Sequence, residues 1–328
     1  MIPIIFDTDM DIDCDDTGAL AVLHALMDIK EAKILGIICD VPSINSAFVA
    51  KAINTYYNYP EIPIGIVKDA TFDTSDKYKM YREDRDKGMS FKGYYPPIIV
   101  NEFDAVDFDE QKVIDCVSLY RTLLSKSKDN SVVIIVVGLL TALAQLMDSD
   151  SDEITTLSGE QLIKKKVRKL ITMGMGTFPN GNAEFNWLMD WESARRVINH
   201  WPTPLVVSTL GSQFRNGKKL SKATPITNPV RRCYEIYMNG QNRGNYSWDL
   251  IAAYHGVRES NPYFEEISGF QIQLKEELGK NYWIEDILNK KNHSYLRLIS
   301  SKVQAKKELE DLLTKLPRNL NNTPYDYF

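Results

Sequence analysis

The sequence contains no apolar run as long as the roughly 18 to 20 residues that a membrane-spanning helix requires. Its cysteines are scattered and form no CxxC pair, which argues against a zinc site and against a disulfide scaffold: Cys14, Cys39, Cys116 and Cys233. An excess of positive charge is also missing, since the 328 residues carry a net charge of -5. We therefore expect neither a membrane nor a nucleic acid polymer as a partner.

The N-terminus leaves no room for an export signal, because the apolar segment from Pro3 to Phe6 follows Met1 almost at once. We expect a cytoplasmic protein, and an exported form stays open if a leader peptide has been removed from the sequence. Internal repeats and low-complexity linkers are lacking as well. A single domain over residues 1–328 is therefore favoured.

Short β-branched runs alternate with helical patterns over the first two thirds of the chain. This alternation predicts an α/β fold, a doubly wound, mostly parallel sheet with helices on both faces. The predicted strands are Pro3 to Phe6, Ile34 to Cys39, Ile62 to Val67, Val132 to Val137, Leu170 to Met173 and Leu205 to Ser208. The predicted helices are Asp16 to Met27, Ser46 to Tyr57, Glu110 to Ser125, Leu140 to Met147 and Trp191 to His200. Ligands of such folds bind beyond the carboxyl ends of the strands.

Three further regions have their own patterns. Residues 71–107 have no clear period and are predicted to form a long excursion, either a lid or a packed surface insertion. Asn228 and Pro229 suit the N-cap and the first turn of a helix that is predicted to run to about Asn239. Residues 266–316 are expected to form a C-terminal β segment followed by a charged amphipathic helix.

The strongest signal is an acidic run that directly follows the first predicted strand. Six carboxylates lie within ten residues: Asp7, Asp9, Asp11, Asp13, Asp15 and Asp16. Like charges at this density raise one another's pKa unless a cation neutralises them. An all-oxygen site with several carboxylates suits Mg²⁺ or Ca²⁺, and a flexible cage with many protein ligands favours Ca²⁺.

Other interpretations of the acidic run remain open at this point. Asp15 and Asp16 would also cap the following helix and complement its dipole without any metal. An EF-hand does not fit, because the glycine and the glutamate of its loop are missing. A DxDx motif after the first strand also occurs in haloacid dehalogenase-like phosphatases, in which Asp7 would be the nucleophile and Asp9 the general acid. The later acidic pair of those enzymes is not found here.

The acidic run resembles the DxDxGxDDAxA motif of the inosine-uridine nucleoside hydrolases, with two extra residues in the loop. Asp7, Asp9, Asp15 and Asp16 take the places of its four carboxylates. Three later segments resemble further motifs of that family, in the same order: Val137 to Ala142 (GxLTN), Asn182 to Asn186 (AEFN) and Ser247 to Asp249 (the late calcium-binding Asp).

The resemblance implies calcium-dependent hydrolysis of the N-glycosidic bond of a ribonucleoside or related riboside. It implies that the Ca²⁺ ligands are Asp9, Asp16, Asp249 and the backbone carbonyl of Val137. It also implies that the residues contacting ribose are Asp7, Asn182, Glu184, Asn186 and Trp248. Asp15 would be the general base, and Asp13 is the alternative because the loop is longer. A homodimer or homotetramer that acts on a small-molecule nucleoside or riboside is expected.

The chemistry suits these residue types independently of the family. Breaking the bond between ribose and base builds positive charge on the sugar, so the site needs an activated water and nearby carboxylates. The family usually has a His that protonates the leaving purine, and Trp248 stands at that position. The general acid is therefore open, and the first candidates are Tyr78, Lys79 and Tyr81 in the excursion. A homologue that binds metal and ribose without turnover is the remaining alternative.

Overall fold

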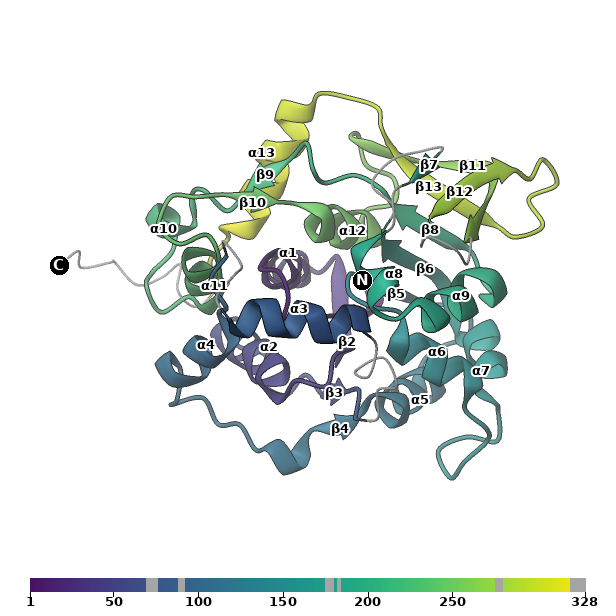
Figure 1. The fold of residues 1–328 in the computed structure, drawn as a ribbon, viewed down its shortest axis with the longest axis horizontal. Helices are drawn as coiled ribbons and strands as arrows, with labels where there is room; N and C mark the ends of the chain where they lie inside the picture. The colour runs from purple at the N-terminus through teal and green to yellow at the C-terminus, as the bar shows by residue number, and fades with distance from the viewer. Residues whose placement is uncertain (69–75, 88–91, 175–179, 182–183, 275–279, 319–328) are drawn as a thin grey trace.

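The computed structural model of the protein describes residues 1–68, 76–87, 92–174, 180–181, 184–274 and 280–318. Within these residues, eleven strands form one mixed sheet with helices on both faces (Figure 1). Across the sheet the order is β4 (Ile114–Asp115), β3 (Ile64–Ile66), β2 (Ala32–Cys39), β1 (Ile2–Thr8), β5 (Val132–Val136), β6 (Val167–Met173), β8 (Leu205–Ser208), β13 (His293–Leu298), β11 (Phe264–Leu274), β12 (Asn281–Glu285) and β7 (Asn180–Gly181).

The strands from β4 to β13 are parallel, and β11, β12 and β7 continue the sheet in antiparallel fashion. All six predicted strands are present, which confirms the predicted fold class. From β1 the chain moves outward through β2, β3 and β4 and then returns to β5 on the other side of β1. The order of the strands therefore reverses between β1 and β5, and the carboxyl ends of these two strands are where an α/β sheet offers a crevice for ligands.

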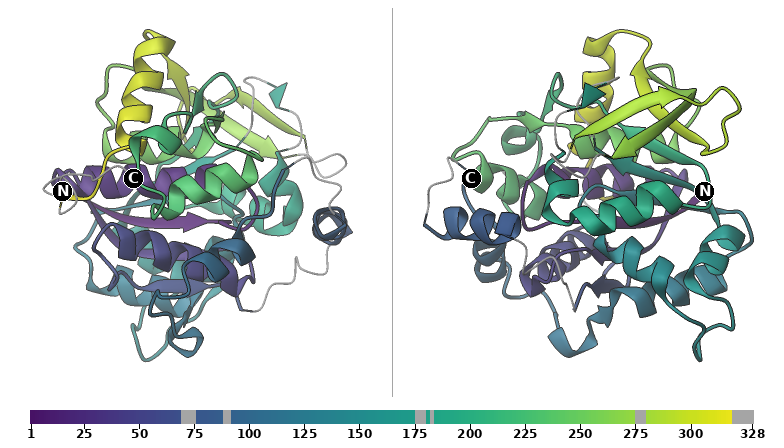
Figure 2. Two further views of the ribbon diagram at one scale, coloured as in Figure 1. Left: turned by 90° about the vertical axis from the view of Figure 1, so that its left-hand side faces the viewer. Right: turned by 45° about the vertical axis from the view of Figure 1, so that its right-hand side comes forward.

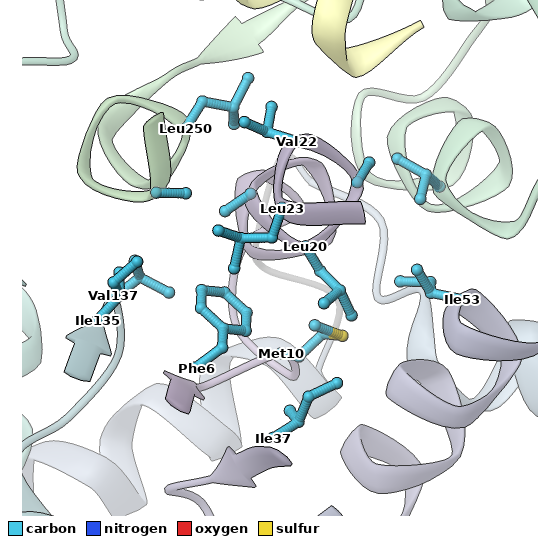
Figure 3. Close-up of a cluster of buried hydrophobic side chains, with 14 of the residues drawn as sticks. Phe6, Met10, Leu20, Val22, Leu23, Ile37, Ile53, Ile135, Val137 and Leu250 are labelled. Carbon is cyan, nitrogen blue, oxygen red and sulfur yellow. The ribbon is translucent and has the colours of Figure 1, made fainter. Parts of the chain in front are cut away.

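Side-chain alternation along β1 explains the two helical layers (Figure 2). Phe6 packs on one face, beneath α1 (Asp15–Asp28), α2 (Ile44–Tyr56), α11 (Pro229–Tyr237), α12 (Trp248–Val257) and α13 (Lys302–Leu313). Ile5 packs on the other face, against α5 (Cys116–Lys126), α6 (Thr141–Asp148), α7 (Gly159–Lys166) and α9 (Trp191–His200). Figure 3 shows Phe6 below Leu20 and Leu23 of α1, with Leu250 of α12 beside them. The first face thus places the starts of α1 and α12 close together.

The excursion at 71–107 is more regular than its sequence indicates. Its described part contains two helices that were not predicted, α3 (Asp76–Asp86) and α4 (Pro96–Glu102). Helix α3 buries only Tyr78 among its described residues, which is why its charged sequence shows no clear apolar period. Helix α4 packs against α2 and α11, whereas α3 contacts α8 (Phe185–Met189).

Two predicted boundaries also need correction. The helix expected from Glu110 begins at Cys116 instead, because Asp115 caps it by accepting the Ser118 N–H, and β4 and a 3-10 turn occupy the preceding residues. The C-terminal β segment begins earlier than predicted, at Phe264, and β13 inserts between β8 and β11 in the main sheet. No helix in the described part of the chain is long and apolar enough to cross a membrane.

Candidate active site

A cavity of about 560 Å³ opens at the crevice between β1 and β5. Its wall includes the residues that follow four neighbouring parallel strands, namely Asp9, Val137, Gly174 and Thr209. This placement follows from the topology, since the carboxyl ends of parallel strands lie at one edge of the sheet. The acidic run therefore opens into the one crevice that the strand order creates.

Three carboxylates meet on one side of the cavity. Asp15 and Asp16 belong to the first turn of α1, and Asp249 belongs to the first turn of α12. One oxygen of each carboxylate lies within 4.8 Å of the others, and all three side chains are buried. Burial first, and the neighbouring carboxylates second, raise the pKa of each well above its usual value. All three side chains can be ionised in the folded protein only if a cation compensates their negative charge.

Asp9 adds a fourth carboxylate beside Asp16, outside that close group. Burial raises the pKa of Asp9 to about 8, because the hydrogen bonds of its carboxylate offset only part of the cost of removing the charge from water. Oδ2 of Asp9 and Oδ1 of Asp249 are buried and have no hydrogen-bond partner. Because buried polar atoms are nearly always satisfied, two such acceptors beside a carboxylate group fit a hard divalent cation with oxygen ligands.

The carbonyl of Val137, the predicted backbone ligand, also lines the cavity. It accepts a hydrogen bond of 2.9 Å from Nδ2 of Asn186. A carbonyl oxygen has two lone pairs, so this bond leaves one acceptor position unused.

Most of the predicted ribose contacts also lie at the cavity. Glu184 precedes α8, Asn186 lies within it, and Trp248 begins α12; all three line the wall. Asn182 lies outside the described residues. Each of the four motifs, which together span residues 7–249, thus contributes at least one residue to the described wall of the cavity.

Asp7 is the exception among the predicted site residues. It does not line the cavity and is completely buried, with Oδ2 accepting a hydrogen bond from the hydroxyl of Tyr120 in α5. The reason is strand alternation, because Asp7 lies on the face of β1 opposite to Phe6. The ribose contact predicted for Asp7 therefore does not fit this arrangement.

A buried carboxylate beside Asp7 was missed by the sequence reasoning. Asp40 directly follows β2, has no exposed surface, and has no hydrogen-bond partner for either oxygen. An added Cβ on Gly138 would lie 2.4 Å from Oδ2 of Asp40 and 2.5 Å from the backbone nitrogen of Asp9. The sequence does contain a signal for Asp40, since this residue directly follows a buried strand as Asp9 does. The residues around Asp40 match no motif, however.

The longer loop gives its two extra carboxylates defined partners. Asp11 accepts hydrogen bonds from Ser43, Tyr94 and Arg85, at 2.8, 2.7 and 2.9 Å, and so ties the excursion to the loop. Asp13 lines the cavity and accepts a bond of 2.6 Å from Asn245 Nδ2 as well as one from its own neighbour's backbone N–H. Asp11 is thus part of the scaffold of the excursion.

Histidine does not contribute to the described part of the cavity wall. His24 is bonded to Asn54, His255 to Glu266, and His293 accepts from a backbone N–H, all within the core. Tyr81 of α3 and Tyr237 of α11 do line the cavity. Of the three excursion residues suggested as general acids, Tyr78 and Lys79 are not among the lining residues.

Comparison with known proteins agrees with this geometry. The family model described as inosine-uridine preferring nucleoside hydrolase matches residues 4–288. The chain belongs to this family. It is therefore an N-ribosyl hydrolase of small-molecule nucleosides, and the phosphatase interpretation of Asp7 and Asp9 is wrong. The group of Asp15, Asp16 and Asp249 could hold a metal ion.

Solved nucleoside hydrolases have the same fold. The inosine-uridine preferring nucleoside hydrolase from Bacillus anthracis is 17% identical over 97% of this chain and 100% of its own, with a TM-score of 0.65. The purine-preferring ribonucleoside hydrolase from Gardnerella vaginalis is 17% identical over 95% and 98%, with a TM-score of 0.63. A plant nucleoside hydrolase is 15% identical over 95% and 99%, with a TM-score of 0.64. A search of curated proteins found no match.

Proposed function

We propose that this nucleoside hydrolase uses Ca²⁺ to cleave the N-glycosidic bond of a ribonucleoside or related riboside, with an Asp carboxylate as general base. The observation that carries the proposal is the buried group of Asp15, Asp16 and Asp249 at the cavity, together with the unpartnered oxygens of Asp9 and Asp249. A purely structural acidic cluster would be expected to have donors on these atoms.

Asp9, Asp16, Asp249 and the carbonyl of Val137 are the proposed metal ligands. They supply oxygen atoms only, three of them from carboxylates, which suits Ca²⁺ and disfavours softer ions. A bound divalent cation would supply Lewis acidity toward a water and an anchor for the ribose hydroxyls. Asp15 accepts a hydrogen bond from the backbone N–H of Asp249 and so links the N-termini of α1 and α12.

Asp15 is the proposed general base, and its surroundings favour it over Asp13. Asp13 accepts hydrogen bonds from Asn245 and from the Cys14 N–H, both through Oδ1, and these two donors fix the orientation of its side chain. Asp15 receives a backbone N–H from Asp249 at a long 3.3 Å and is otherwise directed toward the cavity. Asp9 is the second candidate, because one of its oxygens is unpartnered.

The ribose is proposed to lie against α8. Glu184 and Asn186 would accept and donate hydrogen bonds to the sugar hydroxyls and so fix the sugar for attack by the water on the anomeric carbon. Trp248 would cover the aglycone. Its indole N–H donates hydrogen bonds but is too weak an acid to transfer a proton, so no leaving-group acid is assigned.

The proposal is tested with two neutral ribosides. We expect p-nitrophenyl riboside and inosine both to release ribose in the presence of Ca²⁺, with the nitrophenyl compound faster because its leaving group needs no proton. Calorimetry on the same preparation detects binding without turnover. Binding of ribose with no ribose release from either compound would support the non-catalytic alternative, and absence of both binding and release would refute the proposal.

A further inference from the structure

The cavity has an unusual balance of charge. Six carboxylates line it: Asp9, Asp13, Asp15, Asp16, Glu184 and Asp249. No Lys, Arg or His occurs among its described lining residues. Six segments lie outside the described residues, 69–75, 88–91, 175–179, 182–183, 275–279 and 319–328, and Lys275 is the one Lys, Arg or His that their sequences contain.

Nearby cations offset only part of this negative charge. The ammonium of Lys92 lies 4.9 Å from the centre of the Tyr237 ring. Its positive charge partly offsets the rise that burial causes in the pKa of Asp13. Arg85 is engaged by Asp11. A bound divalent cation neutralises two carboxylates and Lys92 one, so the wall that faces a substrate keeps an excess of negative charge.

Aromatic rings provide the rest of the wall that is available to an aglycone. The ring of Tyr81 lies edge-to-face with Phe185, with centroids 5.6 Å apart, and Phe185 is 40% exposed. Trp248, whose ring centroid lies 4.6 Å from that of Tyr246, also lines the cavity. Aromatic faces in a partly desolvated, negatively charged site attract organic cations.

The two phenols that line the cavity are weak proton donors. Burial and the nearby carboxylates raise the pKa of the phenols of both Tyr81 and Tyr237. A neutral purine needs a proton to leave efficiently. An aglycone that is attached through a quaternary ring nitrogen leaves as a neutral molecule and needs none.

We propose that this site is selective for ribosides whose aglycone carries a fixed positive charge, such as pyridinium or N-alkylated purine ribosides. The inference rests on the proposed function. The C1′–N bond breaks and its electron pair returns to the ring nitrogen, which becomes neutral. Water adds its oxygen to C1′, and its proton passes to the carboxylate base and then to solvent, so one positive charge enters and one proton leaves.

The test compares two pyridinium ribosides that differ at one group, nicotinamide riboside and nicotinic acid riboside. Both have the same type of leaving nitrogen, but the second carries an added carboxylate. We expect kcat/KM for the amide to be at least about tenfold higher, because the added negative charge meets the acidic wall. Inosine and p-nitrophenyl riboside are measured alongside.

A pair of variants isolates the charge of the cavity. Ser212 is exposed and lines the mouth, whereas its neighbour Gln213 is exposed and is not a lining residue. Ser212→Lys is expected to reduce the amide-to-carboxylate ratio by about three- to tenfold. Gln213→Lys adds the same net charge beside it and is expected to leave the ratio nearly unchanged.

The outcomes separate the inference from the proposed function. Equal kcat/KM for the two pyridinium ribosides, or a ratio that Ser212→Lys does not lower, would overturn the charge selectivity. Turnover of inosine with no turnover of nicotinamide riboside would overturn the inference and leave the proposed hydrolase intact. Failure to cleave any of the four compounds would overturn both.

Discussion

Removal of calcium should destabilise the protein in a manner that depends on pH. Burial raises the pKa of Asp9 from its usual value to about 8 and that of Asp7 to about 7. A carboxyl whose pKa is higher in the folded state than in the unfolded state favours folding only while protonated. The metal-free protein should therefore lose stability as the pH rises from about 4 to about 8, by about 1.4 kcal/mol per pH unit for each such group.

Binding of Ca²⁺ should reverse the part of this penalty that comes from Asp9, because the ion pairs with the ionised carboxylate. At a free concentration one hundred times Kd, binding adds about 2.7 kcal/mol to the free energy of unfolding. With an unfolding entropy of about 2.1 cal/mol/K per residue, a chain of 328 residues gains about 4 °C in Tm. The gain should be small at pH 5 and largest near pH 8, where the free carboxylates repel most.

Scanning calorimetry of chelated protein, with and without added Ca²⁺, measures this effect at both pH values. Asp249→Asn should remove most of the gain, since it removes one carboxylate of the close group. Asp28→Asn is the matched control, because Asp28 is a buried carboxylate at the far end of α1 that is bonded to Tyr59. A Tm that does not respond to Ca²⁺, or a gain that is larger at pH 5 than at pH 8, would refute the assignment.

Two further substitutions test the site. Asp15→Asn should lower kcat by about 100-fold to 10,000-fold with little change in bound calcium, because an amide keeps the shape but cannot take a proton from water. If Asp9→Asn or Asp13→Asn gives that result and Asp15→Asn does not, the general base is misassigned. Gly138→Ala should destabilise the fold by about 1 to 3 kcal/mol in denaturant, because the new Cβ would meet backbone of Asp9 at 2.5 Å. Wild-type stability of Gly138→Ala would show that this contact relaxes freely.

Much of the fold can be predicted from the sequence, because local patterns of apolar and polar residues determine the type of each strand and helix. The parallel strands are buried on both faces, so they appear as short continuous apolar runs, and the bounds of α1, α2, α6 and α9 agree with those predicted from helical periodicity within one or two residues. The start of the antiparallel strand β11 was missed, since there only pairing with β13 selects strand over loop. Helix α3 was missed because its contacts, through Arg85 and Tyr81, are to distant segments.

The metal cluster was partly predictable for the same reason. Asp15 and Asp16 are local to one loop and begin one helix, so their joint presence at a strand end is visible in the sequence alone. The addition of Asp249 depends on α12 packing against α1, which only the folded core decides. A family motif pointed to it, whereas no pattern pointed to Asp40, whose partners are set by the register of β1 beside β2.

The sequence alone determined the strand and helix types, the acidic run and the family, because each is encoded by residue type and spacing over short stretches. Tertiary structure decided which carboxylates face the cavity. Strand alternation directs Asp7 toward Tyr120 and away from the cavity, and Asp11 turns toward Arg85 and Tyr94 of the excursion. The physical reason is that a carboxylate's role depends on its partners and burial, and both are set by segments far away in the chain, 113 residues for Asp7 and Tyr120 and 234 residues for Asp15 and Asp249.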